Sequence, residues 1–152
     1  MDLILWRHAE AQEQDAAGDD LTRVLTARGE KQAARVAGWL DRQLPHETRI
    51  LCSPARRCIQ TLQPLGRDYR VMPELAPGSS AQDVLDLVRW PRARRPVLIV
   101  CHQPTLGELA ARLLGLQGEC PVRKGAVWWL RSREREGEPQ TVIVAVQAPD
   151  TV

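Results

Sequence analysis

The chain has 152 residues, of which 43% are hydrophobic and 26% charged, as expected for one globular domain spanning residues 1–152. The net charge of +2 excludes a global polyanion-binding field, so we expect no nucleic-acid partner. No apolar run is long enough for a membrane span or a secretory signal, and the four cysteines lack zinc-finger spacing. These features predict a cytoplasmic protein with reduced thiols that does not bind membranes.

The first half of the chain alternates short apolar runs with helical patterns. Residues 2–7 are predicted to form a buried strand because the apolar run is short and bounded by charge. A polar loop over 9–25 follows, and then a helix that Thr26 caps and Pro45 stops. A second strand is predicted over 49–53, and a proline at its end favours a helix over 55–65.

The second half continues the alternation. It predicts a strand over 69–72, a Pro/Gly loop over 73–80, a helix over 82–90, a strand over 96–101 and a helix over 105–114. Two last strands, over 126–131 and 141–147, are joined by a charged turn over 132–139 and are expected to pair as an edge hairpin. The pattern predicts an α/β three-layer sandwich with a mostly parallel central sheet flanked by helices and an antiparallel edge near the C-terminus.

Polar side chains follow three of the predicted parallel strands. Arg7 and His8 follow the first strand, Arg56 lies one turn beyond the second, and His102 follows the strand over 96–101. Open α/β sheets bind ligands at the carboxyl ends of their strands, so these side chains are expected to meet there. Guanidinium groups neutralise phosphoryl oxygens, and a neutral imidazole can attack phosphorus. The residues therefore predict a phosphate pocket.

The motifs in this region resemble those of the histidine phosphatase superfamily, which has the phosphoglycerate mutase-like fold. The RHAE sequence at 7–10 resembles its RHG signature, and the ordered series spans residues 3 to about 107. The other matches are Leu25-Thr26 with Gly29, Gln32 and Ala33, then Ser53-Pro54-Ala55-Arg56-Arg57 with Gln60-Thr61, Pro73-Glu74-Leu75 and Val100-Cys101-His102-Gln103-Pro104. The short chain and the RHAE and CHQP variants are most similar to the SixA-type phosphohistidine phosphatases.

The resemblance implies specific roles for five residues. His8 is implied as the nucleophile that becomes phosphorylated, and Arg7, Arg56 and His102 complete the phosphate pocket. Glu74 is the candidate general acid by its position. The resemblance implies no metal and no other cofactor, and the residues themselves require none. It favours an enzyme, a phosphohistidine or phosphoramidate phosphatase.

Leaving-group chemistry and chain length point to the substrate. An alkoxide leaving group has a parent pKa near 15 and needs a proton donor, whereas an imidazole, with a pKa of about 6.5, can leave carrying its own proton. The region around Glu74 lacks the Glu-rich, Gly-containing motif of the sugar-phosphate branch, which favours a phosphoramidate. Short connections between elements also favour an open pocket. A phosphorylated protein, such as a histidine-phosphotransfer domain, is the expected partner.

Several alternatives remain at this stage. One alternative function is a phosphomonoesterase for a small phosphorylated metabolite. Another is a non-catalytic phosphate-binding module that uses the basic segment 89–95. That segment is expected to be a solvated helix end and loop. Metal ligation by Cys101 and His102 is disfavoured because adjacent strand residues face opposite ways. Arg57, next to Arg56, is interpreted as a surface residue.

Overall fold

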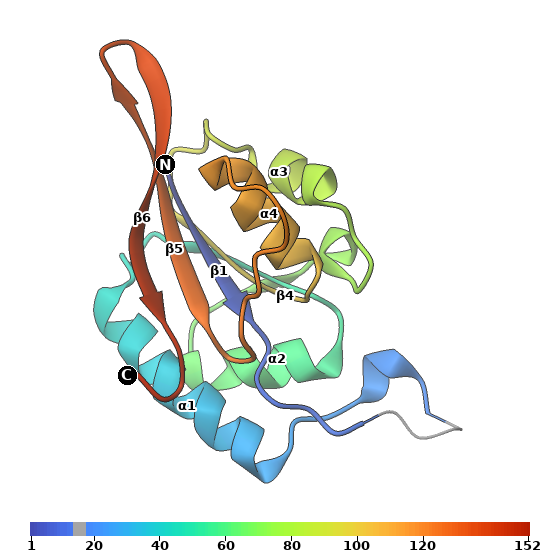
Figure 1. The fold of residues 1–152 in the computed structure, drawn as a ribbon. Helices are drawn as coiled ribbons and strands as arrows, with labels where there is room; N and C mark the ends of the chain where they lie inside the picture. Colours follow the sequence, from blue (N-terminus) through green and yellow to red (C-terminus); the bar gives the residue numbers. More distant parts are fainter. Residues whose placement is uncertain (14–17) are drawn as a thin grey trace.

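A six-stranded sheet forms the centre of the molecule (Figure 1). The computed structural model describes residues 1–13 and 18–152. The strand order is β3-β2-β4-β1-β5-β6. The strands are β1 (Asp2–Arg7), β2 (Arg49–Cys52), β3 (Arg70–Val71), β4 (Val97–Cys101), β5 (Val127–Arg135) and β6 (Glu138–Gln147). The first four run parallel, and the β1–β5 and β5–β6 pairs are antiparallel, which confirms the predicted sheet and edge hairpin.

Helices cover both faces of the sheet, with α1 and α2 on one face and α3 and α4 on the other (Figure 1). They are α1 (Ala27–Gln43), α2 (Arg56–Leu62), α3 (Ala81–Val88) and α4 (Thr105–Leu114), with short 3₁₀ helices η1 (Asp20–Thr22), η2 (Gln63–Leu65) and η3 (Pro73–Leu75). Successive residues of a strand point to opposite faces, so Leu3 packs beneath α3 and α4 and Ile4 beneath α1 and α2. Both faces are buried, which explains the unbroken apolar run of β1.

The start of α1 lies against the segment that follows β1. Thr26 caps the helix, since its Oγ1 accepts a hydrogen bond from Gly29 N at 2.9 Å. Gly29 packs so tightly on the Glu10 carbonyl that any Cβ at this position would collide with the oxygen. The buried stripe of Ala33, Val36 and Leu40 then continues at helical spacing. This packing holds α1 close to the residues after His8.

The strand register places three strand ends side by side. Arg7 pairs with Cys101 between β1 and β4, and Cys52 pairs with Val100 between β2 and β4. The residues that follow, His8, Ser53 and His102, therefore leave the sheet at one edge. The predicted convergence of the three segments is confirmed.

Several predicted boundaries differ from the structure. The charged segment 132–139 belongs mostly to two long strands, because Glu136 and Gly137, with φ of 54° and 79°, form a tight two-residue connection. The helix after β2 ends at Leu62 and continues only as η2, and β3 has two residues. The predicted loop over 9–25 contains η1, and its residues 14–17 lie outside the described residues. In residues 1–13 and 18–152, no helix is long and apolar enough to cross a membrane.

Candidate active site

His8 is buried directly after β1, with one ring nitrogen held by the backbone. Its Nδ1 lies 2.8 Å from the Ala9 carbonyl oxygen, which can only accept a hydrogen bond. Nδ1 therefore carries the proton, and Nε2 carries the lone pair. Consistently, Arg57 Nε donates to His8 Nε2 at 3.4 Å. This hydrogen-bonding pattern leaves Nε2 as the ring nitrogen of His8 that carries a lone pair.

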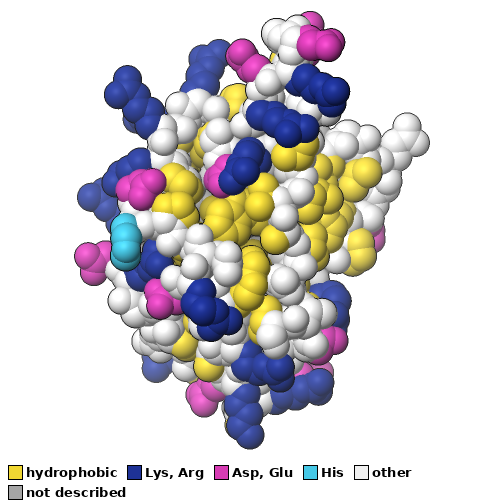
Figure 2. Space-filling model, turned by 90° about the vertical axis from the view of Figure 1, so that its left-hand side faces the viewer, with side chains coloured by type: hydrophobic (Ala, Val, Ile, Leu, Met, Phe, Trp, Pro, Cys, Tyr) yellow, Lys and Arg dark blue, Asp and Glu magenta, His cyan; other side chains and the backbone are white. Residues whose placement is uncertain are grey.

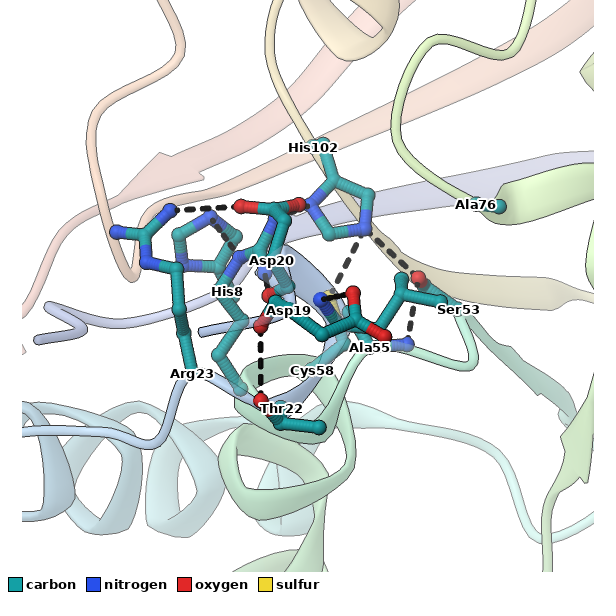
Figure 3. A network of polar contacts seen from close by, with 12 residues as sticks. His8, Asp19, Asp20, Thr22, Arg23, Ser53, Ala55, Cys58, Ala76 and His102 are labelled. Carbon is teal, nitrogen blue, oxygen red and sulfur yellow. Dashed lines mark hydrogen bonds and ion pairs between the residues drawn. The ribbon is translucent and has the colours of Figure 1, made fainter. Parts of the chain in front are cut away.

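His102 lies beside His8 after β4, with a ring-centroid distance of 5.4 Å and an interplanar angle of 55° (Figure 3). Its Nδ1 is 3.3 Å from Arg57 Nη2, and since a guanidinium can only donate, Nδ1 accepts. Its Nε2 then donates to Ser53 Oγ at 2.7 Å. In this arrangement His102 orients Arg57 and is itself held by Ser53.

Arg57, and not Arg56, joins the two histidines. Arg57 is only 4% exposed and contacts both imidazoles, whereas Arg56 is exposed. The expectation that Arg57 is a surface residue is therefore wrong, and Arg56 does not occupy the predicted pocket position. The physical reason is helical geometry: α2 buries the face that carries Arg57, Cys58 and Thr61. Arg57 and Thr61 are four residues apart and so share one helix face, but the adjacent Arg56 obscures this choice in the sequence.

Arg7 supplies a second guanidinium at the end of β1. Its Nη1 donates to the Val122 carbonyl oxygen at 2.9 Å. Its Nε is buried and, among the residues that the structure describes, is the one buried side-chain polar atom without a hydrogen-bond partner. An unpaired buried donor costs free energy, about 1–3 kcal/mol, which an anionic acceptor would offset. The group is thus suited to a phosphoryl oxygen.

Both histidines are neutral at pH 7. Burial, against the opposing hydrogen bond to Ala9 and together with the charges of Arg57 and Arg7, lowers the pKa of His8 to about 4. Burial, followed by the charge of Arg57, lowers the pKa of His102 to about 3. Burial and Arg57 also lower the pKa of Arg7. The pocket is therefore a desolvated site in which two uncharged imidazoles lie beside guanidinium groups.

A carboxylate occupies the free side of Arg57. Asp20, in η1, accepts from Arg57 Nη2 at 3.1 Å, and its backbone carbonyl accepts from Nη1 at 2.8 Å. Arg23 pairs with the same carboxylate at 3.2 Å, as Figure 3 shows. Burial raises the pKa of Asp20, but the bonds from Arg23 and Arg57 outweigh it, so the pKa lies below its usual value. The ionised Asp20 carboxylate therefore occupies the place at the Arg57 guanidinium where another anion could bind.

Glu74 is placed outside this network. It lies exposed in η3, and within the described part of the chain its side chain makes no hydrogen bond or ion pair. Its neighbour Leu75 is buried, and the Leu75 carbonyl accepts a bond from the Cys101 thiol. Glu74 therefore has no contact that orients it toward His8.

The buried cysteines carry no reactive thiolate. Cys52, Cys58 and Cys101 are fully buried, as predicted, and burial raises the pKa of Cys52 and of Cys101 to about 12. In residues 1–13 and 18–152, no three His, Cys, Asp or Glu side chains gather as a metal-binding group.

Asp20, Arg23 and Ser53 belong to the pocket but were not predicted as site residues. Ser53 was readable in principle, because it directly follows β2 at the converging edge. Asp20 and Arg23 lie in a polar segment whose return to the pocket depends on the isolated pairing of Ala11 with Leu25. Only the unusual length of the 9–25 connection signalled a functional loop.

Comparison with known proteins agrees with this geometry. A model of the histidine phosphatase superfamily (branch 1) matches residues 3–78. The phosphohistidine phosphatase SixA of Escherichia coli is 33% identical over 129 residues, covering 80% of this chain and 78% of that protein. A SixA homologue of Haemophilus influenzae is 30% identical over 130 residues, covering 76% and 78%.

Solved structures share the fold over nearly the full length. The protein histidine phosphatase SixA complexed with tungstate has a TM-score of 0.76 and 26% identity, covering 99% of this chain and 98% of that chain. A phosphoserine phosphatase mutant from Entamoeba histolytica has a TM-score of 0.70 and 17% identity, covering 99% and 98%, which shows a common fold. SixA proteins are among the relatives of this chain, and these similarities support phosphatase activity. The chain belongs to the histidine phosphatase superfamily.

Proposed function

We propose that this chain hydrolyses phosphohistidine on a protein through a phosphorylated His8 intermediate, without a metal ion. The observation that carries the proposal is the state of His8: its Nδ1 proton is held by the Ala9 carbonyl, and its Nε2 lone pair faces the guanidinium of Arg57. A neutral imidazole oriented in this way is a competent nucleophile toward phosphorus.

In the first step, Nε2 of His8 attacks the phosphorus of the substrate in line with the leaving nitrogen. The new bond joins Nε2 to phosphorus, and the old phosphorus–nitrogen bond breaks. Its electron pair passes to the leaving ring, whose other nitrogen carries a proton, so that a neutral imidazole leaves. In this proposal Arg57, which contacts His8 Nε2, and Arg7, whose buried Nε has no partner, donate to the equatorial phosphoryl oxygens. Binding there requires Asp20 to give up its place on Arg57.

In the second step, water attacks phospho-His8. The bond between Nε2 and phosphorus breaks, inorganic phosphate leaves, and the water proton passes to phosphate, so His8 returns to its neutral form. The low pKa of His8 makes it a good leaving group in this step, because the neutral imidazole is favoured in the buried pocket.

The placement of the carboxylates supports a phosphoramidate substrate. Glu74 is exposed and unoriented, and Asp20 is ionised because its pKa is lowered, so neither is set to donate a proton to an alkoxide. An imidazole leaves with much less need of such a donor. The same pocket would therefore turn over phosphohistidine faster than phosphate esters.

The test is a substrate panel at matched concentrations. It comprises a histidine-phosphotransfer domain phosphorylated on histidine, phosphoramidate, phosphoserine and a sugar phosphate. We expect the fastest phosphate release from the phosphohistidine protein and an acid-labile phosphoenzyme trapped at His8. Faster turnover of the sugar phosphate would make the chain a small-metabolite phosphomonoesterase, and binding without turnover of any substrate would make it a phosphate-binding module.

A further inference from the structure

A basic groove lies between α1 and the segment that precedes β5. Its cavity of about 310 Å³ is lined by Arg28, Lys31 and Arg35 from α1, by Arg123 and Lys124, and by Asp150 near the C-terminus. In Figure 2, basic side chains gather at the lower end of the face shown, the end at which the N-terminal half of α1 lies in Figure 1. We refer to this cavity as the basic groove.

The basic groove concentrates positive charge far beyond the chain average. Its lining residues include five cations and one carboxylate, although the whole chain carries a net charge of only +2. Of these cations, Arg28 also lies 3.7 Å from the Glu10 carboxylate, and Arg35 donates to the Val152 carbonyl oxygen. Asp150 pairs with Arg123 at 3.2 Å, and both lysines of the chain, Lys31 and Lys124, lie here without an ion pair to any described residue. Like charges held together in this way favour an anionic occupant.

Both walls of the basic groove are bonded to the segment that carries His8. On one wall, Gly125, next to Lys124, donates its backbone N–H to the His8 carbonyl at 3.0 Å. On the other, Gln32, next to Lys31, accepts from Glu10 N at 3.0 Å. Residues of both groove walls are therefore hydrogen-bonded to the backbone of the segment that carries His8, at His8 itself and at Glu10.

The spacing of the cations fits an extended partner better than a single phosphate. Arg28 and Arg35 are seven residues apart on α1, which corresponds to about 10 Å along the helix axis. Lysine ammonium groups are flexible, strongly hydrated charges, suited to long-range attraction rather than to bidentate binding of one anion. Such an arrangement matches several carboxylates spread over a protein surface.

We propose that the basic groove docks an acidic face of the phosphorylated protein substrate and so directs its phosphohistidine toward His8. This inference rests on the proposed function, since it names the surface by which that substrate is recognised. Electrostatic attraction of this kind raises the association rate and weakens with salt.

The test compares two double charge reversals of equal size. One variant carries Lys31→Glu and Lys124→Glu in the basic groove; the control carries Arg89→Glu and Arg95→Glu in a cavity bordered by the start of β2. All four side chains are exposed, and the melting temperature of each variant verifies folding. The substrates are a phosphorylated histidine-phosphotransfer domain with acidic residues around its histidine, and phosphoramidate.

At low salt, K31E/K124E should reduce kcat/KM for the phosphoprotein about tenfold or more, while phosphoramidate turnover stays within about twofold of wild type. Added salt should lower wild-type kcat/KM for the phosphoprotein and leave that of K31E/K124E nearly unchanged. Equal losses for both substrates, an equal loss in the control variant, or wild-type rates in K31E/K124E would each overturn the docking inference.

The outcome also separates the two proposals. Wild-type enzyme that hydrolyses phosphoramidate but not the phosphoprotein would refute the protein-directed function and the docking together, whereas normal phosphoprotein turnover by K31E/K124E refutes docking alone. Single-stranded DNA added as a competitor gives a further check. If it inhibits wild type at low concentration and K31E/K124E does not respond to it, while phosphoprotein kinetics are the same in both, the groove binds nucleic acid instead.

Discussion

Both ends of the sheet carry arginines, but the burial and the hydrogen bonds of these side chains differ between the two ends. At the carboxyl end, Arg57 is buried and its donors have defined acceptors on His8, His102 and Asp20. At the amino end, Arg49, Arg70, Arg89 and Arg95 line a cavity of about 520 Å³ and make no side-chain hydrogen bond within the described part of the chain. Burial and fixed acceptors, not the number of guanidinium groups, distinguish a reaction site from a hydrated basic surface.

The largest expected effect on turnover comes from replacing the histidine at the carboxyl end of the sheet and not the one at the amino end. His8→Ala should reduce phosphate release by at least about 10³-fold, because the nucleophile is lost. His46→Ala is the matched control, since His46 is exposed just before β2 at the amino end, and it should retain wild-type turnover. Substantial turnover by His8→Ala would refute the covalent mechanism.

The next effect separates individual arginines. Arg57→Ala should lower kcat/KM by about 10²-fold, because it removes the donor shared by both imidazoles and by the phosphoryl group. Arg56→Ala, one residue away, and Arg49→Ala, at the amino end, should stay within about twofold of wild type. Steady-state phosphate release measures all three. A larger loss in Arg56→Ala than in Arg57→Ala would reverse the assignment.

Acid pH should lower the stability of the folded protein, because the two neutral histidines at the carboxyl end of the sheet resist protonation. The folded-state pKa values of His8 and His102, about 4 and about 3, lie below the unfolded value of about 6.5. The unfolded chain therefore binds more protons as pH falls from 6.5 toward 4. Stability should be fully present above pH 6.5 and fall by about 1.4 kcal/mol per pH unit for each histidine in that window.

Urea unfolding of wild type and of His8→Ala and His102→Ala between pH 4 and 7 measures this dependence. Each substitution should flatten the curve, and Arg49→Ala should leave its slope unchanged. NMR titration of the imidazole protons gives a direct reading: midpoints of His8 and His102 near 6.5 would contradict the desolvated, neutral pair.

The smallest effect concerns the carboxylates. Asp20→Asn should strengthen inhibition by inorganic phosphate about fivefold, because the phosphate no longer competes with a negative charge for Arg57. Asp68→Asn, in the amino-end cavity, is the control and should leave the inhibition constant unchanged. Weaker phosphate inhibition in Asp20→Asn would mean that Asp20 supports anion binding instead of opposing it.

The sheet and the meeting of the strand ends were predictable, because periodicity and the carboxyl-end rule depend on local sequence. Arg7 ends β1, and His8 and His102 directly follow strands, so the positions of these residues were predictable as well. Arg57 required the buried face of a seven-residue helix, which the two adjacent arginines obscured. The position of Asp20 depends on how the long connection after β1 folds back toward the pocket. This is a property of the tertiary structure that a short sequence pattern does not predict.

Under the proposed function, an anion that binds at the unpaired Nε of Arg7 would couple binding in the pocket to the folding equilibrium. The empty protein retains a buried donor whose desolvation is uncompensated, whereas the unfolded chain solvates the same group with water. An anion that binds only the folded chain shifts this balance by mass action, by about 2.7 kcal/mol at a concentration one hundred times its dissociation constant. Phosphate bound in the proposed pocket should therefore raise the free energy of unfolding.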